Sequence, residues 1–360
     1  MPWSSSACDR AAAVTAAGIT DLRDVRSRPE HWAQAQWGAD AQVPRAWPMP
    51  SNAVLSFRFD VPRSDQARLQ LVTRLSPPGV RRRGNTDVLR QVPLLTTLGE
   101  AGISVAGVVW SSGDPVWFGT DAVIQERLSA YPLHMWDAGL THPGATGGSQ
   151  PFLDQAVDAL AAIHRTPWAE PLGDWEAVRS LASEVAFWDK LLARCEEPAW
   201  VEAGARLRDV LLDRQPDDVA AGILHGDYQT NNVLYDESGR LVAVLDWEIS
   251  GLGSQFLDPG WLAIFTDPSC WDPTYQAGMR VTAEPQSLRR GYEESQQQQV
   301  GGVRLLRCPG LLPLRRDRGL QPAPAQHRTA GRCQLRAHSA FGADAVRPRP
   351  RPGRRMSGPG

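Results

Sequence analysis

Two carboxylates and one amide stand close together in the sequence, on either side of a predicted turn. Asn232 follows Asp227 by five residues and opens a short apolar run. The next residues, 236–239, have the composition of a tight turn, and a second apolar run ends at Asp246. This order predicts a loop followed by a β-hairpin, which would bring the three polar side chains near one another.

These residue types suit the transfer of a phosphoryl group from a nucleotide to a hydroxyl. One carboxylate can accept the hydroxyl proton, while a second carboxylate and an amide oxygen hold Mg²⁺ against the phosphates. His225, Asp227 and Asn232 match the H-x-D-x-x-x-x-N spacing of the protein-kinase catalytic loop, and Asp246 comes 14 residues after Asn232. The alternative to a catalytic site is a chance His-Gly-Asp turn before an ordinary hairpin without function. A metallophosphoesterase would need further histidines, and none follows before His327.

The same segment resembles the phosphotransferase enzyme family, also called aminoglycoside phosphotransferase-like. The usual family form is H-G-D-x-x-x-x-N followed by D-W-E or D-F-E, and this chain has Asp246-Trp247-Glu248 in the second place. The D-W-E form is similar to the kinase-like domains associated with acyl-CoA dehydrogenases. The resemblance covers about residues 50–295 and is strongest over residues 223–262.

This resemblance implies a protein-kinase-like α+β fold with two lobes, a small antiparallel sheet and a mainly helical lobe. It implies Mg²⁺ as cofactor, ATP or GTP as co-substrate, and a hydroxyl group of a small molecule as acceptor. Asp227 would be the catalytic base, and Asn232 and Asp246 would bind the metal. His225, the other candidate catalytic residue, would orient the Asp227 loop rather than transfer protons.

Candidates for nucleotide binding lie in the predicted N-terminal lobe. Residues 69–75 alternate as a strand, and Arg74 stands where protein kinases have a lysine that pairs with the α- and β-phosphates. An ordinary surface arginine is the alternative. Residues 122–128 resemble the hinge between the lobes, so backbone groups of Glu126 and Leu128 would bind the nucleotide base. That role is compatible with a plain core strand.

One kinase feature is missing from the predicted helix 86–98. In protein kinases this helix supplies a glutamate that pairs with the basic strand residue, whereas residues 89–91 here are Leu, Arg and Gln. Either the pair is replaced or the alignment is displaced. The missing acid, the arginine in place of lysine and the unusual tail support a different function, a catalytically impaired nucleotide-binding or scaffold protein of the same fold. The intact set of Asp227, Asn232 and Asp246 argues against that alternative.

Four segments are expected along the chain. They are an irregular lead segment (1–50), a lobe that contains the sheet (51–128), a helical lobe with the catalytic hairpin (129–299) and a tail (300–360). Apolar spacing further predicts strands at residues 54–61 and 103–110, with residues 116–118 as a possible pairing partner. It also predicts a short helix at 11–19 and longer helices at 151–164, 175–194 and 200–212. Residues 81–83, all arginine, are expected to form a solvated turn. His164 and Asp258 are expected to be structural, and Asp258 to brace the catalytic loop.

The tail differs in composition from the rest of the chain. It holds 13 arginines and two aspartates but neither lysine nor glutamate after residue 300. Such a segment is either a basic arm for nucleic acid or anionic lipid, or GC-rich sequence read out of frame. The second interpretation is favoured, and it predicts disorder and the loss of the family's C-terminal helices.

Composition limits the partners and the compartment. The formal net charge of −2 argues against nucleic-acid binding by bulk electrostatics. The sequence has no apolar run of about 18 residues, so no membrane span is expected. No secretory signal is recognised. Five scattered cysteines favour the reducing cytoplasm and argue against a zinc site. We therefore expect a cytoplasmic protein that acts on a small molecule, with its oligomeric state left open.

Overall fold

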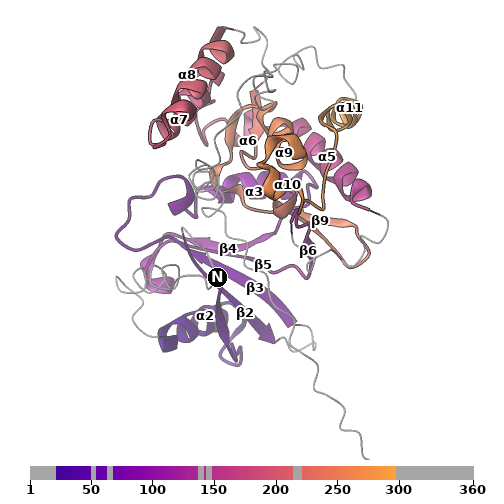
Figure 1. Ribbon diagram of the computed structural model, residues 1–360. Helices are drawn as coiled ribbons and strands as arrows, with labels where there is room; N and C mark the ends of the chain where they lie inside the picture. The colour runs from indigo at the N-terminus through magenta and orange to yellow at the C-terminus, as the bar shows by residue number, and fades with distance from the viewer. Residues whose placement is uncertain are drawn as a thin grey trace, which may run out of the picture.

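A computed structural model describes residues 22–49, 54–62, 68–136, 142, 148–213 and 221–296. These residues form two lobes, an antiparallel sheet with its helices and a mainly helical lobe (Figure 1). The predicted helix at 11–19 and the tail at 300–360 lie outside the described residues. Within the described part, no helix is both long and apolar enough to cross a bilayer.

The N-terminal lobe is built on a five-stranded antiparallel sheet. In spatial order its strands are β1 (Ala46–Met49), β2 (Leu55–Pro62), β3 (Arg68–Leu75), β5 (Ala122–Glu126) and β4 (Val108–Ser112). The predicted strands 54–61 and 69–75 are confirmed as the paired strands β2 and β3. Because strand side chains alternate between faces, Phe59 and Leu71 both point inward and are fully buried.

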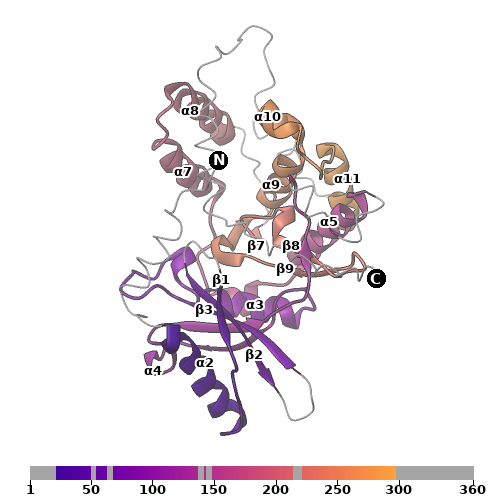
Figure 2. The ribbon, with the colours of Figure 1, turned by 60° about the horizontal axis from the view of Figure 1, so that its bottom comes forward.

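Helix α2 (Leu22–Trp37) covers the side of this sheet that faces away from the helical lobe (Figures 1 and 2). Trp32 is 1% exposed, and its ring lies 6.0 Å from that of Phe59 and 5.9 Å from that of Trp110. The prediction of an irregular lead segment is therefore wrong for its described part. Pro29, a residue that normally interrupts helices, conceals the helical pattern in the sequence.

The helix after β3 begins later than predicted. Residues 84–86 form a single 3₁₀ turn, and α3 (Gln91–Glu100) follows. Pro93 thus lies in the first turn of α3, where its missing N–H is not needed, rather than in the middle of a longer helix. The buried leucines of α3 pack into the core of the helical lobe, so this helix joins the two lobes.

Residues 116–118 do not pair with a strand. They belong to the short helix α4 (Pro115–Phe118), which Asp114 caps by accepting a hydrogen bond from the N–H of Val116 at 2.9 Å. An aspartate followed by proline is a helix-start signal. The nearby strand β4 begins at Val108 instead of the predicted residue 103.

The helical lobe contains α5 (Gln150–Arg165), α6 (Ala169–Leu172), α7 (Leu181–Leu192), α8 (Pro198–Asp213), α9 (Leu257–Thr266), α10 (Pro273–Gln276) and α11 (Pro285–Ser295). The predicted helices 151–164 and 200–212 are confirmed as α5 and α8. The predicted helix 175–194 is shorter than expected, because α7 starts only at Leu181, with Ser180 as its N-cap.

Two small sheets hold the predicted catalytic hairpin at the boundary of the lobes. One pairs β7 (Ala221–Leu224) with β10 (Gly251–Ser254), and the other orders β6 (Tyr131–Pro132), β8 (Val233–Tyr235) and β9 (Leu241–Val244). The hairpin is confirmed, since Val233 of β8 pairs with Val244 of β9. The N–H of Val244 also donates to the carbonyl of Ser104 at 2.8 Å, which ties the hairpin to the segment before β4.

We expect Trp32→Ala to destabilise the fold by about 3–5 kcal/mol, because it would empty a large buried site between α2 and the sheet. Urea unfolding followed by circular dichroism measures the change. Trp37→Ala is the matched control on the same helix, since Trp37 is 42% exposed, and its effect should stay within about 1 kcal/mol. Equal effects of the two substitutions would contradict the packing of α2 described above.

Candidate active site

The turn at the end of β7 is held in place by a buried carboxylate. Asp258 of α9 accepts hydrogen bonds from the backbone N–H groups of His225 and Gly226, each at 2.8 Å. This contact confirms that Asp258 braces the catalytic loop. Gly226 has φ of 87°, and a Cβ there would lie 2.8 Å from the carbonyl oxygen of Ile249. Both the backbone conformation and the close approach therefore require glycine.

His225 is fully buried, and backbone groups occupy both of its ring nitrogens. Nε2 donates to the carbonyl of Leu245 at 2.8 Å, and Nδ1 accepts from the N–H of Asp227 at 3.2 Å. A carbonyl can only accept, so the proton of the neutral ring is on Nε2. This arrangement favours a residue that orients the Asp227 loop over one that exchanges protons with a substrate.

The carboxylate of Asp227 is 1% exposed and is held by three side chains. Gln229 donates to both oxygens at 2.9 Å, Asn232 donates to Oδ2 at 3.1 Å, and the indole N–H of Trp261 donates to Oδ1. Burial raises the pKa of Asp227, while the hydrogen bonds from Trp261 and Gln229 partly oppose that rise. A buried carboxylate with a raised pKa is a better proton acceptor than an exposed aspartate.

Asn232 and Asp246 have the donor atoms that Mg²⁺ prefers. The amide nitrogen of Asn232 donates hydrogen bonds to the backbone oxygen of Asp227, at 2.9 Å, and to the Asp227 carboxylate. No described residue donates a hydrogen bond to the amide oxygen. Asp246 lies near enough to Asp227 for its negative charge to raise the pKa of that residue. A carboxylate and an amide oxygen fit Mg²⁺, which takes its remaining ligands from phosphates and water.

A metal at this place would depend on those further ligands. Among the described residues, no group of three or more His, Cys, Asp or Glu side chains could hold an ion alone.

Asp246 has a left-handed backbone conformation. Of the non-glycine residues that the structure describes, it alone has a positive φ, 64°, a conformation that aspartate and asparagine adopt more readily than other residues with a Cβ. The preceding residue is fixed on both sides: the N–H of Leu245 donates to the carbonyl of Asn232 at 2.7 Å, and its carbonyl accepts from His225. Non-glycine residues in this conformation are common at functional sites.

Arg74 of β3 reaches the segment that follows Asp246. Its guanidinium forms an ion pair with Glu248 and donates to the amide oxygen of Gln91 at 3.3 Å. Arg74 thus has Glu248 as its carboxylate partner and Gln91 of α3 as a neutral partner. These contacts are those expected if the kinase pair is replaced. Burial, together with the charge of Asp246, raises the pKa of Glu248 to about 7 although Arg74 acts to lower it.

Arg90 is a contributor that the sequence did not single out. Its guanidinium pairs with Glu176 and donates to the backbone carbonyls of Ser250 and Glu248, the latter at 3.3 Å. It also lies over the ring of Trp175, 5.1 Å from the centroid. Arg90 therefore ties the loop before α3 to the segment that follows Asp246. Its position beside Gln91 is the only sequence signal that could have indicated this role.

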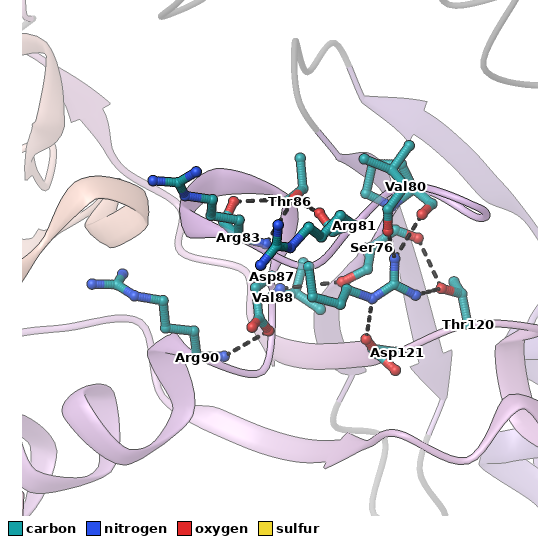
Figure 3. Close-up of polar contacts among 12 residues, drawn as sticks. Ser76, Val80, Arg81, Arg83, Thr86, Asp87, Val88, Arg90, Thr120 and Asp121 are labelled. Atoms are coloured by element: carbon teal, nitrogen blue, oxygen red, sulfur yellow. Dashed lines mark hydrogen bonds and ion pairs between the residues drawn. The ribbon is translucent and has the colours of Figure 1, made fainter. Parts of the chain in front are cut away.

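The three consecutive arginines do not behave alike (Figure 3). Arg82 forms an ion pair with Asp121 and donates to the hydroxyl of Thr120 at 2.7 Å. Arg81 and Arg83 are exposed. The predicted solvated turn is confirmed for these two and is wrong for Arg82, which fastens the loop to the end of the sheet.

Glu126 and Leu128 lie where the chain leaves the sheet for the helical lobe. Glu126 pairs with Leu71 of β3, and its N–H donates to the carbonyl of Gly107 at 3.0 Å. Leu128 follows the last residue of β5 by two positions and is partly buried. Glu126 thus ends the sheet, and Leu128 lies in the connection that follows it. Their contact with a base stays a prediction.

Comparisons with known proteins agree with this geometry. Residues 55–297 match the model of the phosphotransferase enzyme family. Acyl-CoA dehydrogenase family member 11 of Pongo abelii is 25% identical over 199 residues, which cover 54% of this chain and 25% of that protein. Member 10 of Mus musculus is 26% identical over 193 residues, or 52% of this chain and 18% of that protein. The chain thus spans a quarter or less of the length of these relatives. The predicted resemblance to the phosphotransferase enzyme family is confirmed.

A solved structure shows the same fold. A putative aminoglycoside phosphotransferase from Ralstonia eutropha superposes with a TM-score of 0.61 at 20% sequence identity. The match covers 87% of this chain and 96% of that one. The predicted kinase-like fold with two lobes is therefore confirmed.

The raised pKa of Glu248 predicts that stability falls as pH rises. The carboxyl of the unfolded chain ionises near 4.5, whereas the folded protein keeps the proton up to about 7. Between these values only the folded state binds the proton, so rising pH favours unfolding. Urea unfolding across this range should show wild type losing stability relative to Glu248→Gln, which has no proton to lose. A difference between the two proteins that does not vary with pH would contradict the shift.

Proposed function

Because this chain belongs to the phosphotransferase enzyme family, we propose that it transfers the γ-phosphoryl group of ATP or GTP to a hydroxyl of a small molecule. The observation that carries this proposal is the convergence of Asp227, Asn232 and Asp246 at the boundary between the lobes. These side chains supply a proton acceptor and two oxygen ligands, the set that phosphoryl transfer requires.

Asp227 serves as the base. The acceptor hydroxyl attacks the γ-phosphorus and gives its proton to the Asp227 carboxylate, while the bond to the β-phosphate oxygen breaks and ADP or GDP leaves. The hydrogen bonds from Gln229 and Trp261 keep the carboxylate in one orientation, which reduces the entropy lost in reaching the transition state. His225 positions the loop through the N–H of Asp227.

Other residues hold the nucleotide. Asn232 and Asp246 would bind Mg²⁺, which neutralises charge on the phosphate oxygens. Arg74, oriented by Glu248, would steady the α- and β-phosphates. Backbone groups at Glu126 and Leu128 would bind the base. We also place the protein in the cytoplasm, without a nucleic-acid partner, on the composition described above.

A nucleotide-binding scaffold is the alternative function. One of its three supports was the absent helix glutamate, and Glu248 provides a carboxylate partner for Arg74 in its place. A scaffold also has no use for a buried base with a raised pKa. A screen of hydroxylated compounds that follows ADP or GDP release separates the two functions, because a scaffold binds the nucleotide without turnover.

We expect Asp227→Asn to lower phosphoryl transfer at least about 100-fold, since general-base catalysis contributes that much or more. Nucleotide affinity should change little, because the metal ligands remain. A coupled ADP-release assay and calorimetry measure the two quantities. Glu237→Gln is the matched control, as Glu237 is exposed in the turn of the same hairpin. A variant that retains more than about a tenth of the rate would remove Asp227 from the role of base.

Asp246→Asn tests the metal site without disturbing the backbone, because asparagine tolerates the left-handed conformation. We expect the affinity for Mg·ATP to fall at least about tenfold, with the much weaker binding of metal-free ATP unchanged. Calorimetry with and without Mg²⁺ measures both. If Mg·ATP binds to the variant as it does to wild type, Asp246 has only a structural role.

A further inference from the structure

A row of three aromatic side chains leads from Asp227 to the exposed surface of α7. Trp261 donates its indole N–H to the Asp227 carboxylate. The ring of Trp188 lies 5.5 Å from that of Trp261, and the ring of Phe187 lies 5.4 Å from that of Trp188. Phe187 and Trp188 are 54% and 42% exposed. This aromatic row therefore starts at the proposed base and ends in solvent.

The helix that carries the outer part of the row is sparsely packed. Helices α7 and α8 lie against each other, and their ribbons stand apart from those of α9 and α11 in both views (Figures 1 and 2), although Trp188 of α7 reaches Trp261 of α9. In α7 only Leu181 and Glu184 are buried, and no residue of α8 is buried. Two adjacent large aromatic residues on such a helix form an exposed apolar surface. Such surfaces, when continuous with a polar site, mark places where ligands bind.

The charges of α7 do not favour a polycation. Glu184 forms an ion pair with Arg179 at 2.9 Å, and Asp189 pairs with Arg208 of α8 at 3.4 Å. Both carboxylates of the helix are thus already neutralised by arginine. A molecule with several ammonium groups would gain little there, whereas an apolar ring would gain contact area against the exposed tryptophan.

We propose that the aromatic row binds the apolar body of the phosphate acceptor. The acceptor is then an alcohol with a flat or bulky apolar part rather than a polycationic or fully polar polyol. Its hydroxyl lies at the carboxylate of Asp227, and its apolar part lies along Trp261 and Trp188. This inference rests on the proposed function, because it takes Asp227 as the base that receives the hydroxyl proton.

Three hydroxylated probes test the class of acceptor: 2-(2-naphthyl)ethanol, which is aromatic and neutral, glucose, a neutral polyol, and kanamycin, a polycationic polyol. Each is titrated by calorimetry into the protein saturated with Mg²⁺ and a non-hydrolysable ATP analogue. We expect the naphthyl alcohol to bind at least tenfold more tightly than the other two. Tighter binding of glucose or kanamycin, or no binding of the naphthyl alcohol, would overturn the proposal.

Substitutions test the row itself. Trp188→Ala should weaken binding of the naphthyl alcohol at least fivefold, and Trp188→Phe should stay within twofold of wild type because it keeps a ring. Trp37→Ala is the matched control: Trp37 is also 42% exposed and also contacts a second tryptophan, Trp32. It should leave binding unchanged. Equal effects of Trp188→Ala and Trp37→Ala would overturn the role of the row.

The same titrations separate this inference from the proposed function. Failure of the wild-type protein to bind the Mg²⁺-loaded ATP analogue would overturn both. Normal binding of the analogue without a preference for the naphthyl alcohol would overturn only the assignment of the acceptor class.

Discussion

The buried carboxylate of Asp258 determines the geometry on which the rest of the site depends. It accepts two backbone hydrogen bonds from the catalytic loop and a third from Nε2 of His164 at 3.1 Å. A buried carboxylate without such partners would be costly, so α9 and the loop stabilise each other. The hydroxyl of Tyr292 lies 2.6 Å from Nδ1 of His164, so the chain of hydrogen bonds from Asp258 continues to α11. Because Trp261 follows Asp258 by three residues on the same helix face, the helix that fixes the loop also delivers a donor to Asp227.

The site gathers more negative charge than its own cations offset. Burial raises the pKa of both Asp227 and Glu248, and the negative charge of Asp246 adds to each rise, so Asp246 repels both of these carboxylates. Arg74 pairs with one of them, while Arg90 binds backbone carbonyls of the same segment. A divalent cation at Asp246 would relieve this repulsion, and the phosphates would then balance the cation. The charge distribution is consistent with the Mg·nucleotide site proposed above.

The sequence pattern predicted structure that forms between residues close in the chain, but it did not predict contacts between residues far apart in the chain. The loop and hairpin from Asp227 to Asp246 follow from spacing and turn chemistry within 20 residues. The partner of Arg74 is 174 residues away, at Glu248, and no periodicity relates two such positions. The late start of α3 was missed because proline favours the first turn of a helix as much as it disrupts the middle. Helix α2 was missed for the opposite reason, since Pro29 lies inside it.

Arginine in place of the usual lysine is consistent with this architecture. A lysine ammonium offers three donors on one atom, whereas a guanidinium offers five in a planar fork. Arg74 uses Nη2 for Glu248 and Nη1 for Gln91. Its guanidinium has further N–H donors, which the proposed function assigns to the phosphates of a nucleotide. The fork spans a carboxylate from the helical lobe and an amide from α3. One residue of the sheet thereby connects three elements at the place where the phosphates would lie.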